Sequence, residues 1–120
     1  MTRDVVQLDP LLSAMADLWA PHRVATVNDY DVKVAKIQGD FVEHAHDETD
    51  EFFLVLDGEL VIELPDREVR LAPHDVFVVP KGVRHRPKAA VETTILMFEP
   101  RGTVNTGDAG GELTREPVDV

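Results

Sequence analysis

Apolar and polar residues follow a short-period pattern along most of the chain between Val24 and Phe98. A period of two places alternate side chains on one face of a β-strand, while a short continuous apolar run is typical of a buried strand. Turn-forming residues separate these segments, so the pattern predicts an all-β fold, an antiparallel sandwich or barrel. We expect strands over residues 24–27, 30–37, 42–46, 52–56, 59–64, 68–71, 76–79 and 93–98.

A helical pattern precedes the strands. Asp9 is a carboxylate at a helix N-cap position, Pro10 suits the first turn, and Pro21 ends the pattern. The apolar residues in this region fall at helical spacing and form one stripe: Leu8, Leu11, Leu12, Met15, Leu18 and Trp19. The stripe covers either the domain's own core or a partner subunit.

A chain of 120 residues predicts one domain with a modest core. We divide it into an N-terminal arm with a short helix (1–22), a β-barrel (23–100) and a C-terminal tail (101–120). The tail is polar and rich in glycine. It is either flexible or an arm that lies along the barrel or a neighbouring molecule.

Charge and composition narrow the classes of partner. A net charge of −11 argues against nucleic acids and anionic membrane surfaces, which both attract basic proteins. The chain has no cysteine and no apolar run long enough to span a bilayer, and its first twenty residues do not resemble a signal peptide. We therefore expect a cytoplasmic protein that binds neither nucleic acid nor membrane.

The candidate chemistry lies in the segment GDFVEHAHDETDEFFLVLDG, residues 39–58. His44 and His46 point to the same side if residues 42–46 are extended. Residues 47–50 are polar and predict a turn, and a hairpin through them brings Glu51 back beside the two histidines. Two imidazoles and a carboxylate suit zinc, manganese, iron(II) or nickel.

These residues resemble the first motif of the cupin family, in which a glycine, H-x-H, a glutamate and a second glycine follow one another. Here they are Gly39, His44, His46, Glu51 and Gly58.

The second cupin motif is matched by Pro80, Gly82 and His85, with two departures from the pattern. His74 replaces a glycine, which suggests a turn that needs no unusual φ. Ala89 replaces an asparagine that is poorly kept in the family.

The resemblance covers about residues 30–98 and implies a jelly-roll barrel, or double-stranded β-helix. It implies one divalent metal (zinc, manganese, iron, nickel or cobalt) bound by His44, His46, Glu51 and His85, together with a small-molecule ligand and a homodimer. Residues 19–21 and 99–108 are similar to single-cupin bacterial proteins commonly called mannose-6-phosphate isomerase-like.

Charged residues surround both motifs. Carboxylates near the first motif predict a solvated rim: Glu43, Asp47, Glu48 and Asp50. Basic residues near the second motif either pair with these carboxylates, which we favour, or hold an anionic substrate: Lys81, Arg84, Arg86 and Lys88. If the second segment is extended, His85 faces away from Arg84 and Arg86. We place His22 and His74 at the surface, outside the metal site.

Two classes of function follow. One is a metal-dependent enzyme, such as an isomerase, oxygenase or lyase, and the other is a module that binds a metal or small ligand without turnover. The sequence shows no additional general base inside the barrel, so it assigns no catalytic residue.

Overall fold

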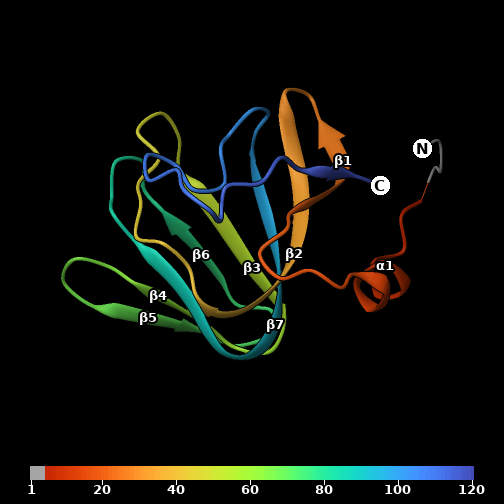
Figure 1. Ribbon diagram of the computed structural model, residues 1–120, viewed down its shortest axis with the longest axis horizontal. Coiled ribbons are helices and arrows are strands. Elements are labelled where there is room, and N and C mark those ends of the chain that lie inside the picture. The colour runs from red at the N-terminus through yellow and green to blue at the C-terminus, as the bar shows by residue number, and fades with distance from the viewer. Residues whose placement is uncertain (1–4) are drawn as a thin grey trace.

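The computed structural model describes residues 5–120, so the first four residues of the expected N-terminal arm lie outside it. Helix α1 spans Leu8–Ala14, and strands follow in the order drawn in Figure 1. They are β1 (His22–Val27), β2 (Tyr30–Asp40), β3 (Glu51–Asp57), β4 (Leu60–Glu63), β5 (Glu68–Leu71), β6 (Val76–Val79), β7 (Arg86–Pro100) and β8 (Val118–Asp119). The all-β prediction is confirmed.

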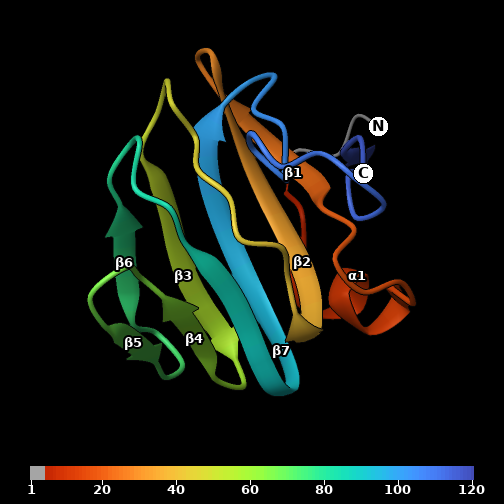
Figure 2. The same ribbon diagram turned by 60° about the vertical axis from the view of Figure 1, so that its left-hand side comes forward.

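Strand β7 connects the barrel. It pairs with β2 along one edge, from Tyr30 opposite Pro100 to Asp40 opposite Lys88, and with β3 and β4 along the other edge. Figure 2 shows β2, β7 and β3 running side by side. The predicted jelly-roll barrel is confirmed, with one difference: β8 pairs with β1 in the parallel direction, so the sheet is mixed.

The barrel interior changes character along its length. Ile37 on β2, Val55 on β3 and Ile95 on β7 belong to one buried apolar cluster. Ala35 and Lys33 precede Ile37 by two and four residues on the same face of β2, and both are buried. The interior is therefore apolar at one end of these strands and carries charged groups at the other.

The helix is shorter than the pattern predicts. It begins after Gln7, which makes no side-chain cap, and Met15 already has an extended ψ of 125°. Leu18 instead pairs with Lys36 in an isolated bridge, and the Trp19 N–H donates to the Lys36 carbonyl at 2.8 Å. Pairing with β2 thus overrides helical periodicity in residues 15–19.

The expected hairpin through residues 47–50 does not form. Residues 42–46 form no strand, and their one ladder contact is a bridge between His44 and His85. Glu51 begins β3, which pairs with β6 and β7. Glu51 therefore approaches the histidines from a different strand pair.

The turn at His74 also differs from expectation. His74 has a φ of 74°, in the left-handed region that favours glycine. The turn therefore has an unusual φ even though histidine stands where the cupin motif has glycine, and the expectation of an ordinary φ was wrong. The turn is held by hydrogen bonds from His74 N to the Val55 carbonyl and from Asp75 N to the Ala72 carbonyl. At Gly58, in contrast, the motif keeps the glycine that the structure requires, because a Cβ there would lie 2.4 Å from Thr93 Oγ1.

The C-terminal residues lie along the barrel as an arm. Figure 1 shows them, in dark blue, crossing one end of the barrel toward β1. Thr106 is fully buried, and Val118 pairs with His22. No helix in residues 5–120 is long and apolar enough to cross a membrane.

Candidate metal centre

Three separate segments carry the four residues that the sequence singled out. His44 and His46 lie in the connection before β3, Glu51 is the first residue of β3, and His85 lies immediately before β7. The backbones of His44 and His85 exchange two hydrogen bonds, of 2.9 and 2.8 Å, which join the first and third segments. This bridge places the two imidazole rings 4.4 Å apart between centroids.

The four side chains converge inside the barrel. One nitrogen or oxygen atom from each lies within 4.8 Å of the others, and all four residues are buried. Nε2 of His46 lies 3.0 Å from Oε2 of Glu51, and Nε2 of His85 lies 3.1 Å from Oε1 of the same carboxylate. The structure therefore brings together the whole set expected from the sequence.

Backbone carbonyls orient two of the imidazoles. Nδ1 of His44 lies 2.9 Å from the Val42 carbonyl, and Nδ1 of His85 lies 3.0 Å from the Val83 carbonyl. A carbonyl only accepts, so Nδ1 carries a proton in both rings, and Nε2 is the nitrogen that faces the centre. Nε2 of His44 is buried without any hydrogen-bond partner among the described residues, which fits an atom meant for a metal.

Burial and mutual contact shift the pKa values of the side chains in this cluster. Burial lowers the pKa of His44 to about 4, so this imidazole is neutral at neutral pH. Burial alone would raise the pKa of Glu51, but the closeness of His46 and His85 outweighs it and holds that pKa well below its usual value. Burial lowers the pKa of His46, but the Glu51 carboxylate more than compensates and leaves it raised. A raised pKa means that protons compete with a cation for this imidazole.

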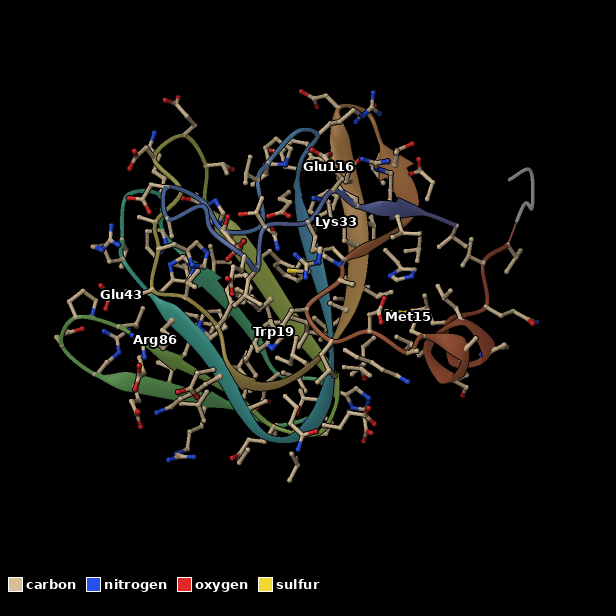
Figure 3. The ribbon with its side chains drawn as sticks, viewed as in Figure 1. Met15, Trp19, Lys33, Glu43, Arg86 and Glu116 are labelled. Atoms are coloured by element: carbon tan, nitrogen blue, oxygen red, sulfur yellow. The ribbon has the colours of Figure 1, made fainter. Side chains whose placement is uncertain are left out.

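Sequence reasoning missed a charged pair beside this cluster. Nζ of Lys33 on β2 lies 3.1 Å from Oε1 of Glu99 on β7, and both side chains are buried (Figure 3 labels Lys33). Burial and then the charge of Glu51 raise the pKa of Glu99 to about 7. The signal was present: Lys33 stands two and four places from Ala35 and Ile37, on their inward face of β2.

Three of the four basic residues near the second motif form ion pairs, but only one of these pairs involves a carboxylate near the first motif, as the favoured interpretation predicts. Arg84 binds Glu43 and Asp108, and Lys88 binds Glu63 and Glu68. These partners include one carboxylate that the sequence singled out and three that it did not.

The other expectations for this region are met in part. Arg84 and Arg86 are outside the core while His85 is 1% exposed, which matches the predicted alternation. His74 is exposed, and His22 is half-buried in β1 with Nδ1 close to the Ala20 carbonyl. Neither belongs to the cluster.

Two cavities adjoin the cluster. An apolar chamber of about 40 Å³ is bounded by His44 and Glu51 and by Trp19, Phe53 and Met97 among others. An open cavity of about 490 Å³ lies beside His46, between residues 45–49 and 100–108. Trp19 covers part of the chamber by stacking on Phe41, with ring centroids 4.7 Å apart (Figure 3 labels Trp19).

Known proteins are similar to this chain. An uncharacterized protein of Bacillus subtilis (strain 168), YdbB, is 39% identical over 77 residues, which cover 63% of this chain and 68% of the relative. The crystal structure of a cupin-2 domain containing protein from Shewanella frigidimarina NCIMB 400 superposes with a TM-score of 0.79 and 39% identity, over 81% of this chain and 95% of that one.

A larger protein contains the same fold. Hydroquinone 1,2-dioxygenase from Sphingomonas sp. TTNP3, solved with 4-hydroxybenzoate bound, superposes with a TM-score of 0.73 and 24% identity, over 78% of this chain and 31% of that one. At this identity the likeness concerns the fold alone.

The family model Cupin_2, described as a cupin domain, matches residues 30–99. This range holds all four converging side chains and every strand from β2 to the end of β7, except the last residue of β7. By this match, the chain belongs to the cupin family.

Proposed function

We propose that this cupin binds one divalent metal ion through His44, His46, Glu51 and His85 and is a metal-dependent enzyme acting on a small molecule. The observation that carries the proposal is the convergence of four buried donor atoms within 4.8 Å of one another inside the barrel. Burying three imidazoles and a carboxylate together is costly, and Nε2 of His44 has no hydrogen-bond partner among the described residues.

The types of donor atom narrow the range of candidate metal ions. Three imidazole nitrogens and one carboxylate oxygen suit borderline divalent ions, and the chain offers no thiolate. Zinc, manganese, iron, nickel and cobalt remain the candidates. When bound, such an ion polarises a substrate oxygen or lowers the pKa of a bound water.

The residues of this chain would prepare the centre in three ways. The Val42 and Val83 carbonyls hold two imidazoles in one tautomer. Trp19 and its apolar neighbours keep water away from the chamber beside His44 and Glu51. The small volume of that chamber, about 40 Å³, favours a small substrate or the reacting end of a larger one.

One observation favours the alternative, a module that binds a metal or small ligand without turnover. Apart from His44 and Glu51, the described residues that line the apolar chamber include no ionisable side chain. A metal-dependent reaction that moves protons would then rely on metal-bound water or on a group outside this chamber. A mannose-6-phosphate isomerase-like activity stays a prediction, as does the reaction class.

Elemental analysis of the purified protein tests the metal, and we expect one ion per chain. His46→Ala should lose most of that metal, while His74→Ala, which removes an exposed imidazole outside the cluster, should keep it. Equal losses in the two variants, or a parent protein that binds no divalent ion when loaded and dialysed, would contradict the ligand assignment.

Screening the loaded protein against small oxygenated substrates separates the two classes of function. Turnover that disappears with a chelator and returns with the metal supports an enzyme. Ligand binding without turnover supports the module.

A further inference from the structure

The C-terminal arm contacts the backbone between the two histidines of the first motif. Ala45 stands between His44 and His46, and its N–H donates to Oδ1 of Asp108 at 2.9 Å. In return, the N–H of Asp108 donates to the Ala45 carbonyl at 3.1 Å. These two hydrogen bonds fix the backbone that carries both imidazoles, across a sequence separation of 63 residues.

The same carboxylate reaches the second ligand-bearing segment. Oδ2 of Asp108 accepts a hydrogen bond of 2.9 Å from Nη1 of Arg84, the residue before His85. Arg84 also donates through Nε to Oε1 of Glu43, the residue before His44, at 3.3 Å. The carboxylate of Asp108 thus spans the first and second motifs on the outer side of the His44–His85 bridge.

The arm is shaped for this contact. Gly107 has a φ of 53°, and a Cβ at this position would lie 2.3 Å from the Ala45 carbonyl oxygen and 2.8 Å from Cδ2 of His44. Only glycine allows the arm to come this close to the backbone of the first motif. Thr106, beside it, is fully buried and shares a hydrogen bond of 2.6 Å with Thr114.

We propose that Asp108 is a positioning residue of the metal centre, which holds the His44–His46 segment and the His85 segment at the separation that the ion requires. The inference rests on the proposed metal site and deepens it. Groups that orient metal ligands at one remove typically change metal affinity about 10–100-fold when they are lost. A tail residue that served only to dock the arm would change the stability of the metal-free protein and leave the affinity unaltered.

Titration of the metal-free full chain with Co²⁺, followed by visible absorption, tests the proposal. We expect Asp108→Ala to weaken Co²⁺ binding about 10–100-fold and to alter the absorption bands, because the ligands shift relative to one another. Asp108→Asn keeps an acceptor for the Ala45 N–H but loses the charge that Arg84 binds, so it should lose less affinity. This second variant decides the question if Asp108→Ala fails to fold.

Asp119→Ala is the matched control. It removes another C-terminal carboxylate that pairs with an arginine, Arg23, but does not touch either ligand-bearing segment. Its affinity and bands should equal those of the parent.

Three results would overturn the inference. If Asp108→Ala and Asp108→Asn bind Co²⁺ as the parent does, Asp108 has no positioning role, and the metal site itself stands. If Asp119→Ala loses as much affinity as Asp108→Ala, docking of the arm alone accounts for the effect. If the parent binds no Co²⁺, the proposed function fails together with the inference.

Discussion

Lys33 and Glu99 form an ion pair inside the barrel, with Nζ 3.1 Å from Oε1 and side-chain exposures of 1% and 3%. They lie on the adjacent strands β2 and β7, at the level of the barrel where Glu51 also points inward. Oε2 of Glu99 has no hydrogen-bond partner among the described residues. The pair lies beside the proposed ligand Glu51, whose charge acts on Glu99 and helps to raise its pKa.

Breaking this pair should destabilise the protein. Lys33→Met leaves Glu99 buried without its cation, so we expect the free energy of unfolding to fall by about 3 kcal/mol. Because Glu99 can take up a proton, with its pKa already raised to about 7, the loss should be smaller at pH 6 than at about pH 8. Urea unfolding in the presence of a chelator measures it without any contribution from metal.

A double replacement supplies the control for that experiment. Lys33→Met combined with Glu99→Leu removes both charges, and the result should lie within about 1 kcal/mol of the parent. A single variant as stable as the parent would show that the pair has no role in stability. A double variant no better than the single one would show that packing, and not charge, explains the loss.

The stability that a bound metal adds should disappear in acid. The ligating imidazoles must be neutral, so the metal holds their folded-state pKa values below the unfolded value of about 6.5. As pH falls, the unfolded chain then takes up protons before the folded one does. The metal's contribution is largest at a pH above the raised pKa of metal-free His46, and it is lost as pH falls through the lowered pKa values of the metal-bound imidazoles.

Melting temperatures with metal and with chelator, compared between about pH 8 and about pH 4.5, give this contribution. A contribution that stays constant over the whole range would exclude histidine ligation. If the metal's contribution to stability decreases in acid but is the same in His85→Ala as in the parent, His85 is not a ligand.

His74 offers a stabilising substitution. Its φ of 74° costs an ordinary side chain about 1 kcal/mol, whereas glycine adopts this conformation freely. Because His74 is exposed and lies outside the metal cluster, His74→Gly should raise the free energy of unfolding by about 0.5–1 kcal/mol without changing metal content. Thermal unfolding measures the gain, and a loss of stability would mean that the imidazole makes a compensating contact.

Helix α1 bears on the predicted homodimer. None of its residues is fully buried, and Figures 1 and 2 both show it to one side of the barrel. If a second copy covers its apolar stripe, Leu12→Asp should shift sedimentation toward the monomer. Val91→Asp, which changes an exposed valine outside the helix, should not.

A parent protein that sediments as a monomer would end the dimer prediction. A dimer that both variants leave intact would place the interface elsewhere.

Local pattern predicted most of the strands, because a period of two is visible within a few residues. The spacing of His44, His46 and Glu51, with the cupin resemblance adding His85, named the whole converging set. The prediction that a hairpin through residues 47–50 brings Glu51 to the histidines was wrong, since strand pairing is decided by residues far along the chain. Pairing of Leu18 and Trp19 with Lys36 likewise shortened the helix, and no pattern within residues 8–19 shows it.

Two contributions to the site were hidden for different reasons. The alternation of Lys33 with Ala35 and Ile37 indicates an inward side chain, but lysines are so rarely buried that the sequence alone does not favour this position. Asp108 carries no local signal, because its role depends on a hydrogen bond to Ala45, 63 residues away.

The place of β7 in the sheet affects how the protein is made. β2, β3 and β4 all pair with a strand that comes later than they do, at residues 86–100. During synthesis these apolar strands emerge before that partner exists, and they remain available to chaperones or to other chains until it does. The barrel then closes through contacts between distant residues, which slows folding. Asp108 follows β7 in the sequence, so all four proposed ligands leave the ribosome before the residue that we propose to position them.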